Sequence, residues 1–506
     1  MLSLKTVLLI LSRESITHEV FKVSKEGVFK YESEDIPLSF FSFSSNDIRR
    51  DTIFIGLYGS RHNGSNFACD AIRNGAKVVL INTKKPIASY DSLGEHSAFV
   101  ILTKDTMRAF YSIAQYKRNI IDGIVICITG SYGKTTIKEM IVNSLNRLFV
   151  RIYDQNHTYA VANEGNKNTM ISLMQTLCNA NENLDCLVLE LGMSSRGEIR
   201  KMVTLAKPHI AMLVSISNAH FQSFNTVQDI CQAKCEIFKH KDSLCILNTN
   251  MNSFEKIYKS LKKCKREIVL YGSASTEYKL RNFTSHLVED DFSTDVEAVI
   301  CGRTMKYKIG DIGAHIVENS IASICAISCI CRMLTVDYEN ILLRYNHILS
   351  GFKALQGRGA ATFCKIKTGR FLLLDESYNN PPNAIMAAID RAIVFAEAMN
   401  SRAIAVLGDM AELGTLAEEE HTRALTYVAN SNLELVFLIG ENMEKALSEI
   451  VESKQKIQIF STYNELLNEI NNTLRENDVL VVKGARNMAL NRIVEAFIKD
   501  PAQRLV

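Results

Sequence analysis

The stretch Ile128-Thr-Gly-Ser-Tyr-Gly-Lys-Thr-Thr-Ile-Lys138 decides the fold class of the middle of this chain. It follows the apolar run Ile124-Val-Ile-Cys127 and precedes an apolar-periodic segment, residues 137–148, so we predict a strand, a glycine loop and a helix. In such a loop, backbone N–H groups and the positive end of the helix face phosphate groups. The loop residues that we expect at the phosphates are Gly130, Ser131, Gly133, Lys134, Thr135 and Thr136, and the Thr135 hydroxyl can also ligate Mg²⁺.

The glycine loop departs from the general phosphate-loop pattern at one position. Ile128 stands where the first glycine of that pattern is expected, so the loop reads T-G-x-x-G-K-T-T. The alternative is an ordinary strand-to-helix turn. The Lys-Thr-Thr sequence directly after the second glycine, at a helix start, favours phosphate binding.

Composition and charge limit the classes of protein to consider. At 506 residues the chain is too long for a single core. Hydrophobic residues make up 47% and charged residues 22%, as in a soluble globular protein. The net charge of +3 comes without a dense basic tract, which gives no indication of nucleic-acid binding. No apolar run is long enough to span a membrane, and the short apolar segment at residues 1–11 lacks a cleavage site, so we expect a first helix or strand there.

The thirteen cysteines mostly lie within apolar segments, and none forms a C-x-x-C pair. This pattern indicates buried, reduced thiols in a cytoplasmic protein. A zinc site is the alternative.

The order of predicted elements indicates an α/β protein of three domains. We expect domains at residues 1–112, 113–350 and 351–506. Strands in the second and third domains are continuous apolar runs separated by helices, which indicates parallel sheets covered on both faces. We expect the third domain to be Rossmann-like. Residues 277–310 alternate between apolar and polar and predict a short antiparallel section.

Two polar residues stand at positions where a parallel sheet would place a ligand site. Glu190 ends the predicted strand Cys186-Leu-Val-Leu-Glu190, and His220 follows the run Ala211–Ile216. With Thr135, Glu190 would hold Mg²⁺. The alternatives are a solvated acid at a strand end and a histidine satisfied by local polar contacts. Lys234 lies in Ala233-Lys-Cys-Glu-Ile-Phe238, on a predicted helix.

Read together, these motifs resemble the Mur ligase family of peptidoglycan synthesis. The first part of the resemblance is the ordered series T-G-S-Y-G-K-T-T, L-E-L-G, N-A-H-F and A-K-C-E-I-F. The third domain adds three more segments that resemble one member of the family: Leu374-Asp-Glu-Ser-Tyr-Asn-Asn-Pro-Pro-Asn383, Val406-Leu-Gly-Asp-Met-Ala-Glu-Leu-Gly414 with His421, and Val482-Lys-Gly-Ala-Arg486. The matches extend from about residue 45 to about residue 495.

The resemblance implies an ATP-dependent amide ligase that joins D-alanyl-D-alanine to a UDP-N-acetylmuramoyl-tripeptide through an acyl phosphate. It implies an N-terminal UDP-sugar-binding domain, a central ATP-binding domain and a C-terminal domain that binds the incoming dipeptide. ATP and two Mg²⁺ ions would be required, and we expect a cytoplasmic monomer that neither spans a membrane nor binds nucleic acid.

The resemblance also assigns roles to residues. Lys134, Lys234 and His220 would be catalytic, with Lys234 carbamylated. Carbamylation requires a neutral amine and therefore a lowered pKa. The metal ligands would be Thr135, Glu190, His220 and Lys234. The nucleotide would be contacted by Asn319, Arg358 and Asp375, and the substrates by Ser45, Asn46, Tyr378 and Asn379.

Several positions depart from the family pattern. Asn46 stands where an Arg usually follows Asp-Ser in the uridine-binding domain, Ser194-Ser195 replaces Asn-His, and Glu376 replaces Asp. Ile316, Asn63-Gly-Ser65 and Thr169 also differ. Three alternatives remain open: another ligase of the superfamily, either the third-residue-adding enzyme or a folylpolyglutamate synthase; a degenerate nucleotide-binding protein; and a phosphotransferase, for which no kinase catalytic loop is evident.

Overall fold

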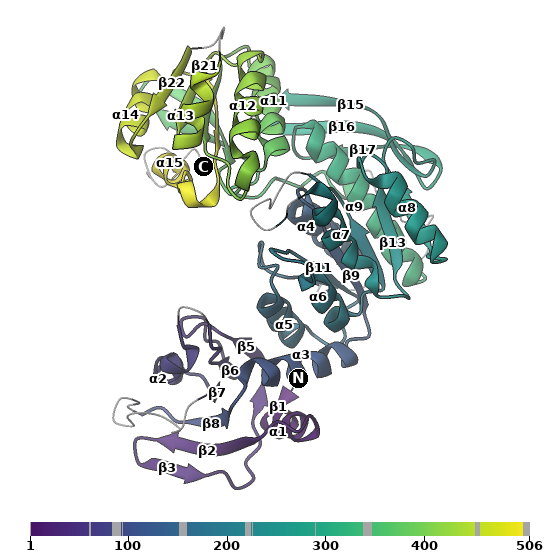
Figure 1. Ribbon diagram of the computed structural model, residues 1–506, viewed down its shortest axis with the longest axis vertical. Coiled ribbons are helices and arrows are strands. Elements are labelled where there is room, and N and C mark those ends of the chain that lie inside the picture. The colour runs from purple at the N-terminus through teal and green to yellow at the C-terminus, as the bar shows by residue number, and fades with distance from the viewer. Residues whose placement is uncertain are drawn as a thin grey trace. The chain divides into compact units, whose positions relative to one another are not determined.

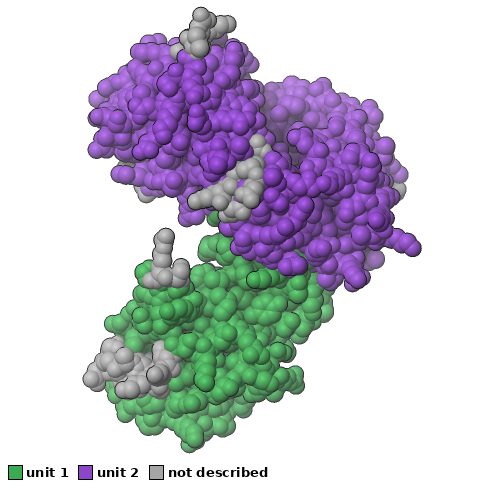
Figure 2. All heavy atoms as spheres, in the orientation of Figure 1, with its two compact units in different colours: residues 1–125, 160–189, 201–207 green, residues 126–159, 190–200, 208–506 purple. Residues whose placement is uncertain are grey.

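The structure is a computed structural model of the chain and describes residues 2–59, 62–82, 93, 95–150, 159–217, 224, 226–288, 290–336, 347–450 and 456–498. The chain forms two compact units (Figure 2). The first contains residues 1–125, 160–189 and 201–207, and the second contains residues 126–159, 190–200 and 208–506. The domain boundaries predicted from the sequence stay predictions.

The N-terminal part of the first unit is built on a six-stranded sheet with the order β3-β2-β8-β7-β6-β5 (Figure 1). Its strands are β2 (His18–Ser24), β3 (Gly27–Lys30), β5 (Phe40–Ser42), β6 (Thr52–Ile55), β7 (Val78–Ile81) and β8 (Ala98–Thr103). Strands β5 to β8 pair in parallel, whereas β2 runs antiparallel to both of its neighbours. Every residue of β6 and β7 is buried, as expected for apolar strands covered on both faces.

Helices and one short strand pair accompany this sheet. They are α1 (Leu4–Arg13), α2 (Ala68–Arg73) and α3 (Thr106–Ile120), with β1 (Leu2–Ser3) paired to β4 (Pro37–Leu38). Ser3 caps α1, because its side chain accepts a hydrogen bond from the Thr6 amide. The apolar N-terminal segment is therefore a helix of the first unit, as the sequence predicts.

A second six-stranded sheet has the order β10-β11-β9-β12-β13-β14. Its strands are β9 (Ile124–Thr129), β10 (Ala160–Ala162), β11 (Cys186–Glu190), β12 (Ile210–Leu213), β13 (Leu244–Asn248) and β14 (Ile268–Tyr271). The pairings of β10 with β11, β9 with β12, and β12 to β14 in turn are parallel. The accompanying helices are α4 (Lys134–Val150), α5 (Met170–Asn179), α6 (Glu198–Ala206), α7 (Val227–Lys234) and α8 (Phe254–Lys263).

An antiparallel sheet and a long helix follow. The sheet consists of β15 (Tyr278–Val288), β16 (Asp291–Ile300) and β17 (Arg303–Ile309), and the helix is α9 (Ala314–Met333). Within the described residues, α9 alone is long and apolar enough to cross a membrane, but 78% of its apolar window is buried inside the protein. This burial is typical of a core helix.

The third large sheet, within the second unit, has the order β18-β19-β23-β20-β21-β22. Its strands are β18 (Ala360–Ile366), β19 (Gly369–Glu376), β20 (Ala403–Gly408), β21 (Leu435–Ile439), β22 (Lys456–Phe460) and β23 (Val479–Lys483). All pairings are parallel except that of β18 with β19. The helices are α11 (Pro382–Ala398), α12 (Ala417–Ala429), α13 (Glu441–Ser448), α14 (Tyr463–Thr473) and α15 (Asn491–Ile498).

Alternate residues of β19 point into two separate cores. Leu372 and Leu374 pack in one cluster with α11 and α12, whereas Phe371 and Leu373 pack in the other with α14 and α15. The sheet is thus covered on both faces. The predicted α/β class with parallel sheets is confirmed, and so is the antiparallel section at residues 277–310.

Candidate active site

The loop between β9 and α4 is held by residues that follow β12. The Ser131 amide donates to the Ser215 carbonyl oxygen at 3.0 Å, and the Tyr132 amide donates to Ser215 Oγ at 2.9 Å. The Ser217 amide donates in turn to Ser131 Oγ at 2.9 Å. Because β12 is the parallel neighbour of β9, the glycine loop is fixed at the carboxyl edge of the sheet, where ligands bind in open α/β sheets.

Two glycines in this loop leave no room for a side chain. Gly133 adopts a φ of +82°, and a Cβ atom there would lie 2.9 Å from Asn319 Oδ1. A Cβ atom on Gly130 would lie 2.9 Å from Ser215 Oγ. Because these glycines have no side chain, phosphate groups can approach the backbone N–H groups at the start of α4, where phosphates commonly bind. The loop therefore fits the nucleotide that the sequence predicts.

Two lysine amines meet at the carbonyl of Gly130. Lys134 Nζ donates to that oxygen at 2.6 Å and Lys234 Nζ donates to it at 3.1 Å. Lys234 ends α7 and is only 2% exposed, and its burial and the neighbouring Lys134 charge hold its pKa well below 10.5. Burial also lowers the pKa of Lys134, an effect that Glu190 opposes and Arg358 reinforces. The site therefore favours a neutral amine on Lys234.

Two oxygen ligands suitable for Mg²⁺ are in contact beside these amines. Thr135, in the first turn of α4, donates its hydroxyl to Glu190 Oε2 at 2.6 Å, and both side chains are buried. Carboxylate and hydroxyl oxygens are the ligands that Mg²⁺ prefers. These two residues fit the predicted ion. The predicted ligand His220 lies outside the described residues.

A second group of predicted residues gathers around the end of β19. Asp375 accepts a hydrogen bond from the Gly357 amide at 2.6 Å and another from Ser377 Oγ at 2.6 Å. Through Gly357 it fixes the backbone next to Arg358, whose guanidinium carbon lies 4.4 Å from the centre of the Tyr378 ring. This segment belongs to the same unit as the glycine loop, and the Arg358 charge contributes to the lowered pKa of Lys134.

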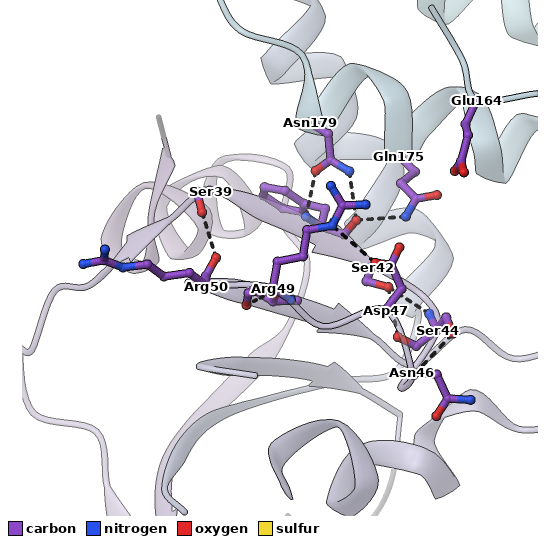
Figure 3. A network of polar contacts seen from close by, with 12 residues as sticks. Ser39, Ser42, Ser44, Asn46, Asp47, Arg49, Arg50, Glu164, Gln175 and Asn179 are labelled. Carbon is purple, nitrogen blue, oxygen red and sulfur yellow. Dashed lines mark hydrogen bonds and ion pairs between the residues drawn. The ribbon is translucent and has the colours of Figure 1, made fainter. Parts of the chain in front are cut away.

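The predicted substrate residues Ser45 and Asn46 lie in the first unit, in the loop after β5; Figure 3 shows Asn46. The Ser45 carbonyl accepts a hydrogen bond from Asn74 Nδ2 at 2.7 Å, and the Asn46 amide donates to Ser44 Oγ at 3.4 Å. Asn46 is exposed. The structure therefore places these two residues in a different unit from the glycine loop.

Comparison with known protein families decides the classification. The profile of the Mur ligase middle domain matches residues 128–327, and the profile of the Mur ligase glutamate ligase domain matches residues 365–486. Together they cover more than half of the chain. The chain belongs to the Mur ligase family.

Individual members of the family resemble this Mur ligase over almost its whole length. The UDP-N-acetylmuramoyl-tripeptide–D-alanyl-D-alanine ligase of Rickettsia prowazekii is 27% identical over 90% of this chain and 94% of its own. A crystal structure of MurF from Acinetobacter baumannii superposes with a TM-score of 0.77 at 22% identity, covering 98% of both chains. MurF ligase from Thermotoga maritima in complex with ADP gives a TM-score of 0.70 at 24% identity, covering 91% of this chain and 97% of that one.

The structure brings together most of the site residues predicted from the sequence. In and beside the glycine loop of this Mur ligase lie Gly130, Ser131, Gly133, Lys134, Thr135, Thr136, Glu190, Lys234 and Asn319. Arg358, Asp375, Tyr378 and Asn379 form the second group, around the end of β19 in the same unit. Their roles stay predictions.

Sequence reasoning missed one buried lysine beside this segment. Lys483, at the end of β23, donates to the Asn379 carbonyl at 2.9 Å and lies 3.6 Å from Glu376 Oε2. Its burial lowers its pKa, which the Glu376 carboxylate partly offsets. The signal was available in the Val482-Lys-Gly-Ala-Arg486 motif, to which no role was assigned.

The alternative of a zinc site gains no support. Within the described part of the chain, no three His, Cys, Asp or Glu side chains are arranged to hold a metal ion, and all thirteen cysteines are free thiols.

Proposed function

We propose that this chain is the ATP-dependent ligase that joins D-alanyl-D-alanine to the terminal carboxylate of a UDP-N-acetylmuramoyl-tripeptide in peptidoglycan precursor synthesis. The observation that carries the proposal is the match to the Rickettsia prowazekii ligase of that name, which covers 94% of that protein. The intact glycine loop, Glu190 and Lys234 support an active enzyme rather than a degenerate one.

The proposed reaction has two steps. The terminal carboxylate of the donor attacks the γ-phosphorus of ATP, so that ADP leaves and an acyl phosphate forms. The amine of D-alanyl-D-alanine then attacks the acyl carbon, and phosphate leaves from the tetrahedral intermediate with loss of a proton from nitrogen. Lys134 would neutralise charge on the transferred phosphoryl group, and the loop N–H groups would hold the remaining phosphates in place.

Other residues would hold the nucleotide and the metal. Asn319, Arg358 and Asp375 would contact the nucleotide, and Tyr378 and Asn379 would face the dipeptide. Thr135 and Glu190 would hold one Mg²⁺, while His220 and the carbamate of Lys234 would hold a second. The two ions would supply charge neutralisation at the phosphates.

The surroundings of Lys234 support its proposed carbamylation. A neutral amine can attack CO₂, forming an N–C bond and releasing one proton, and the lowered pKa of Lys234 favours the neutral form. The product is an anion, which would suit a position beside Lys134 and a metal ion. We further propose a cytoplasmic monomer that does not bind nucleic acid, in keeping with thirteen free cysteines and a net charge of +3.

The experiment that tests the function is an ATP-dependent phosphate-release assay with mass spectrometry of the product. UDP-N-acetylmuramoyl-tripeptides ending in diaminopimelate or lysine serve as donors, and D-alanyl-D-alanine, D-alanine, L-lysine and L-glutamate as acceptors. We expect fastest release with the dipeptide, because a site built for its amide and carboxylate leaves polar groups unpaired with a single amino acid, at a cost of about 1–3 kcal/mol per group. Equal or faster release with a single amino acid would overturn the acceptor assignment.

A further inference from the structure

The loop that joins β5 to β6 in the first unit carries an arginine in an unusually well-defined position. The Arg49 amide donates to Thr52 Oγ1 at 2.8 Å, and the same hydroxyl donates to the Arg49 carbonyl at 2.7 Å. Thr52 is the first residue of β6, so this double contact ties the backbone of Arg49 to the sheet.

The guanidinium group of Arg49 makes two further contacts, and Figure 3 shows the one with Asp47. Its Nε atom donates to Asp47 Oδ1 at 3.3 Å, and its central carbon lies 4.0 Å from the centre of the Phe40 ring. Among the described residues, the two terminal nitrogens have no hydrogen-bond partner, and the side chain is 63% exposed. A planar guanidinium edge that carries the terminal N–H donors is thus presented to solvent.

Strand β5, which carries Phe40, is held by hydrogen bonds to side chains of α5. Phe41, the middle residue of the edge strand β5, donates its N–H to Asn179 Oδ1 at 2.7 Å. Its carbonyl accepts hydrogen bonds from Asn179 Nδ2 at 3.1 Å and from Gln175 Nε2 at 3.0 Å (Figure 3). Two amide side chains of α5 therefore satisfy the free edge of β5, as another strand would. This fixes Phe40, on which the Arg49 guanidinium stacks.

We propose that Arg49 binds the diphosphate of the UDP-linked donor, supplying from three residues further along the chain the cation that this chain lacks at Asn46. The inference rests on the proposed function, because it concerns that donor. A guanidinium edge with two parallel N–H groups matches two oxygens of a phosphate, and such charge-assisted, two-point hydrogen bonds are among the strongest that a side chain makes. Asp47 accepts its hydrogen bond from Nε, so the edge formed by the two terminal nitrogens is left for the ligand.

The neighbouring arginine provides a matched control. Arg50 is 94% exposed and lies 3.6 Å from Asp51, with no aromatic ring under its guanidinium among the contacts of the described residues. Arg49→Gln and Arg50→Gln remove the same charge one residue apart. The measurements are the KM for the UDP-tripeptide, the KM for ATP, and the Kd of the donor and of UDP alone by calorimetry.

We expect Arg49→Gln to raise the KM of the donor and the Kd of both the donor and UDP by about tenfold or more, the scale of a lost charge-assisted hydrogen bond. The KM for ATP should not change, and Arg50→Gln should stay within about twofold of wild type. Arg49→Lys, which keeps the charge but not the fork, should lie between wild type and Arg49→Gln. Adding Asn46→Arg to Arg49→Gln should restore part of the affinity.

The outcomes separate this inference from the function on which it rests. If wild type turns over the UDP-tripeptide and Arg49→Gln binds donor and UDP as wild type does, Arg49 has no such role while the ligase assignment stands. If wild type turns over no UDP-linked donor, the proposed function fails, and UDP titration of wild type and Arg49→Gln still decides the role of Arg49. Absence of UDP binding to wild type refutes the role as well. If circular dichroism shows that Arg49→Gln does not fold, the donor KM and the Kd of donor and UDP are compared between wild type, Arg49→Lys and Asn46→Arg instead.

Discussion

At the residue scale, the carbonyl of Gly130 is the point where two lysines meet, and the two have different expected roles. Lys134 lies directly after the glycine loop and keeps Glu190 as a favourable neighbour. We expect Lys134→Ala to lower turnover by at least about 10²-fold, the scale for losing one preorganised electrostatic contact. Steady-state phosphate release measures this effect. Lys306→Ala, at an exposed lysine of β17, is the control, and near-normal turnover of Lys134→Ala would contradict its role.

Lys234 is expected to act as an anion rather than as a cation. We predict that Lys234→Ala is nearly inactive and that short-chain carboxylates partly restore its turnover, because they replace the charge of the carbamate. Wild type incubated with ¹³C-labelled bicarbonate should show a carbamate signal in ¹³C NMR that is missing from Lys234→Ala. An unmodified ammonium in well-ordered electron density of enzyme that is active under the same conditions would rule the carbamate out.

The uncarbamylated amine of Lys234 should also leave a signature in the pH dependence of stability. Its pKa in the folded protein lies well below 10.5, so between those two values the unfolded chain binds more protons than the folded one. The free energy of unfolding therefore rises with pH in that window, by at most about 1.4 kcal/mol per pH unit for one proton. In CO₂-free buffer, urea unfolding at pH 8 and pH 10 should show a steeper rise for wild type than for Lys234→Met. Equal slopes would show that Lys234 titrates normally.

At the scale of elements, the glutamate of the A-K-C-E-I-F motif has a structural task. Glu236, in the 3₁₀ helix Cys235–Lys239, accepts hydrogen bonds from the Gly197 amide at 3.0 Å and the Arg200 amide at 3.1 Å. These N–H groups lie at the start of α6, so a carboxylate from a distant segment caps that helix. Glu236→Ala should lower the free energy of unfolding by about 1–3 kcal/mol, because buried donors lose their acceptor. Urea denaturation measures this loss, with Glu255→Ala, on the exposed face of α8, as the control; an equal effect of both variants would contradict the cap.

Elements with continuous apolar sequences could be predicted, including the edge strand β14, whereas the two edge strands of the third sheet could not. The strands β11, β12 and β20 are buried throughout, and β9 is buried in all but its first residue, so their largely apolar runs identify them. The missed strands β18 and β22 lie at the two edges of the third sheet, where partly exposed residues break the run. Their positions depend on pairing with β19 and β21, which local sequence does not encode.

At the scale of the whole molecule, the order of motifs predicts the family and its chemistry, but not the contacts that shape the site. The glycine loop could be predicted because phosphate binding needs a strand, glycines and a helix in sequence. Its support by Ser215 and Ser217 could not, since those residues reach it across the sheet from β12. The contact of Lys483 with Asn379 could not be predicted either, because it depends on the pairing of β19 with β23.

The division into two units leads to a prediction about where each substrate acts. The residues proposed to bind the donor, Ser45, Asn46 and Arg49, belong to the first unit. The glycine loop, Arg358 and Asp375, which are proposed to bind the nucleotide, belong to the second. Hydrogen–deuterium exchange of the full chain should therefore show slower exchange at residues 43–51 with the UDP-tripeptide alone. A non-hydrolysable ATP analogue with Mg²⁺ should slow exchange at residues 130–136 and 357–359, because ordered ligands protect the backbone that they contact. Protection of residues 43–51 by the ATP analogue alone, and not by the donor, would reverse the assignment of substrates to units.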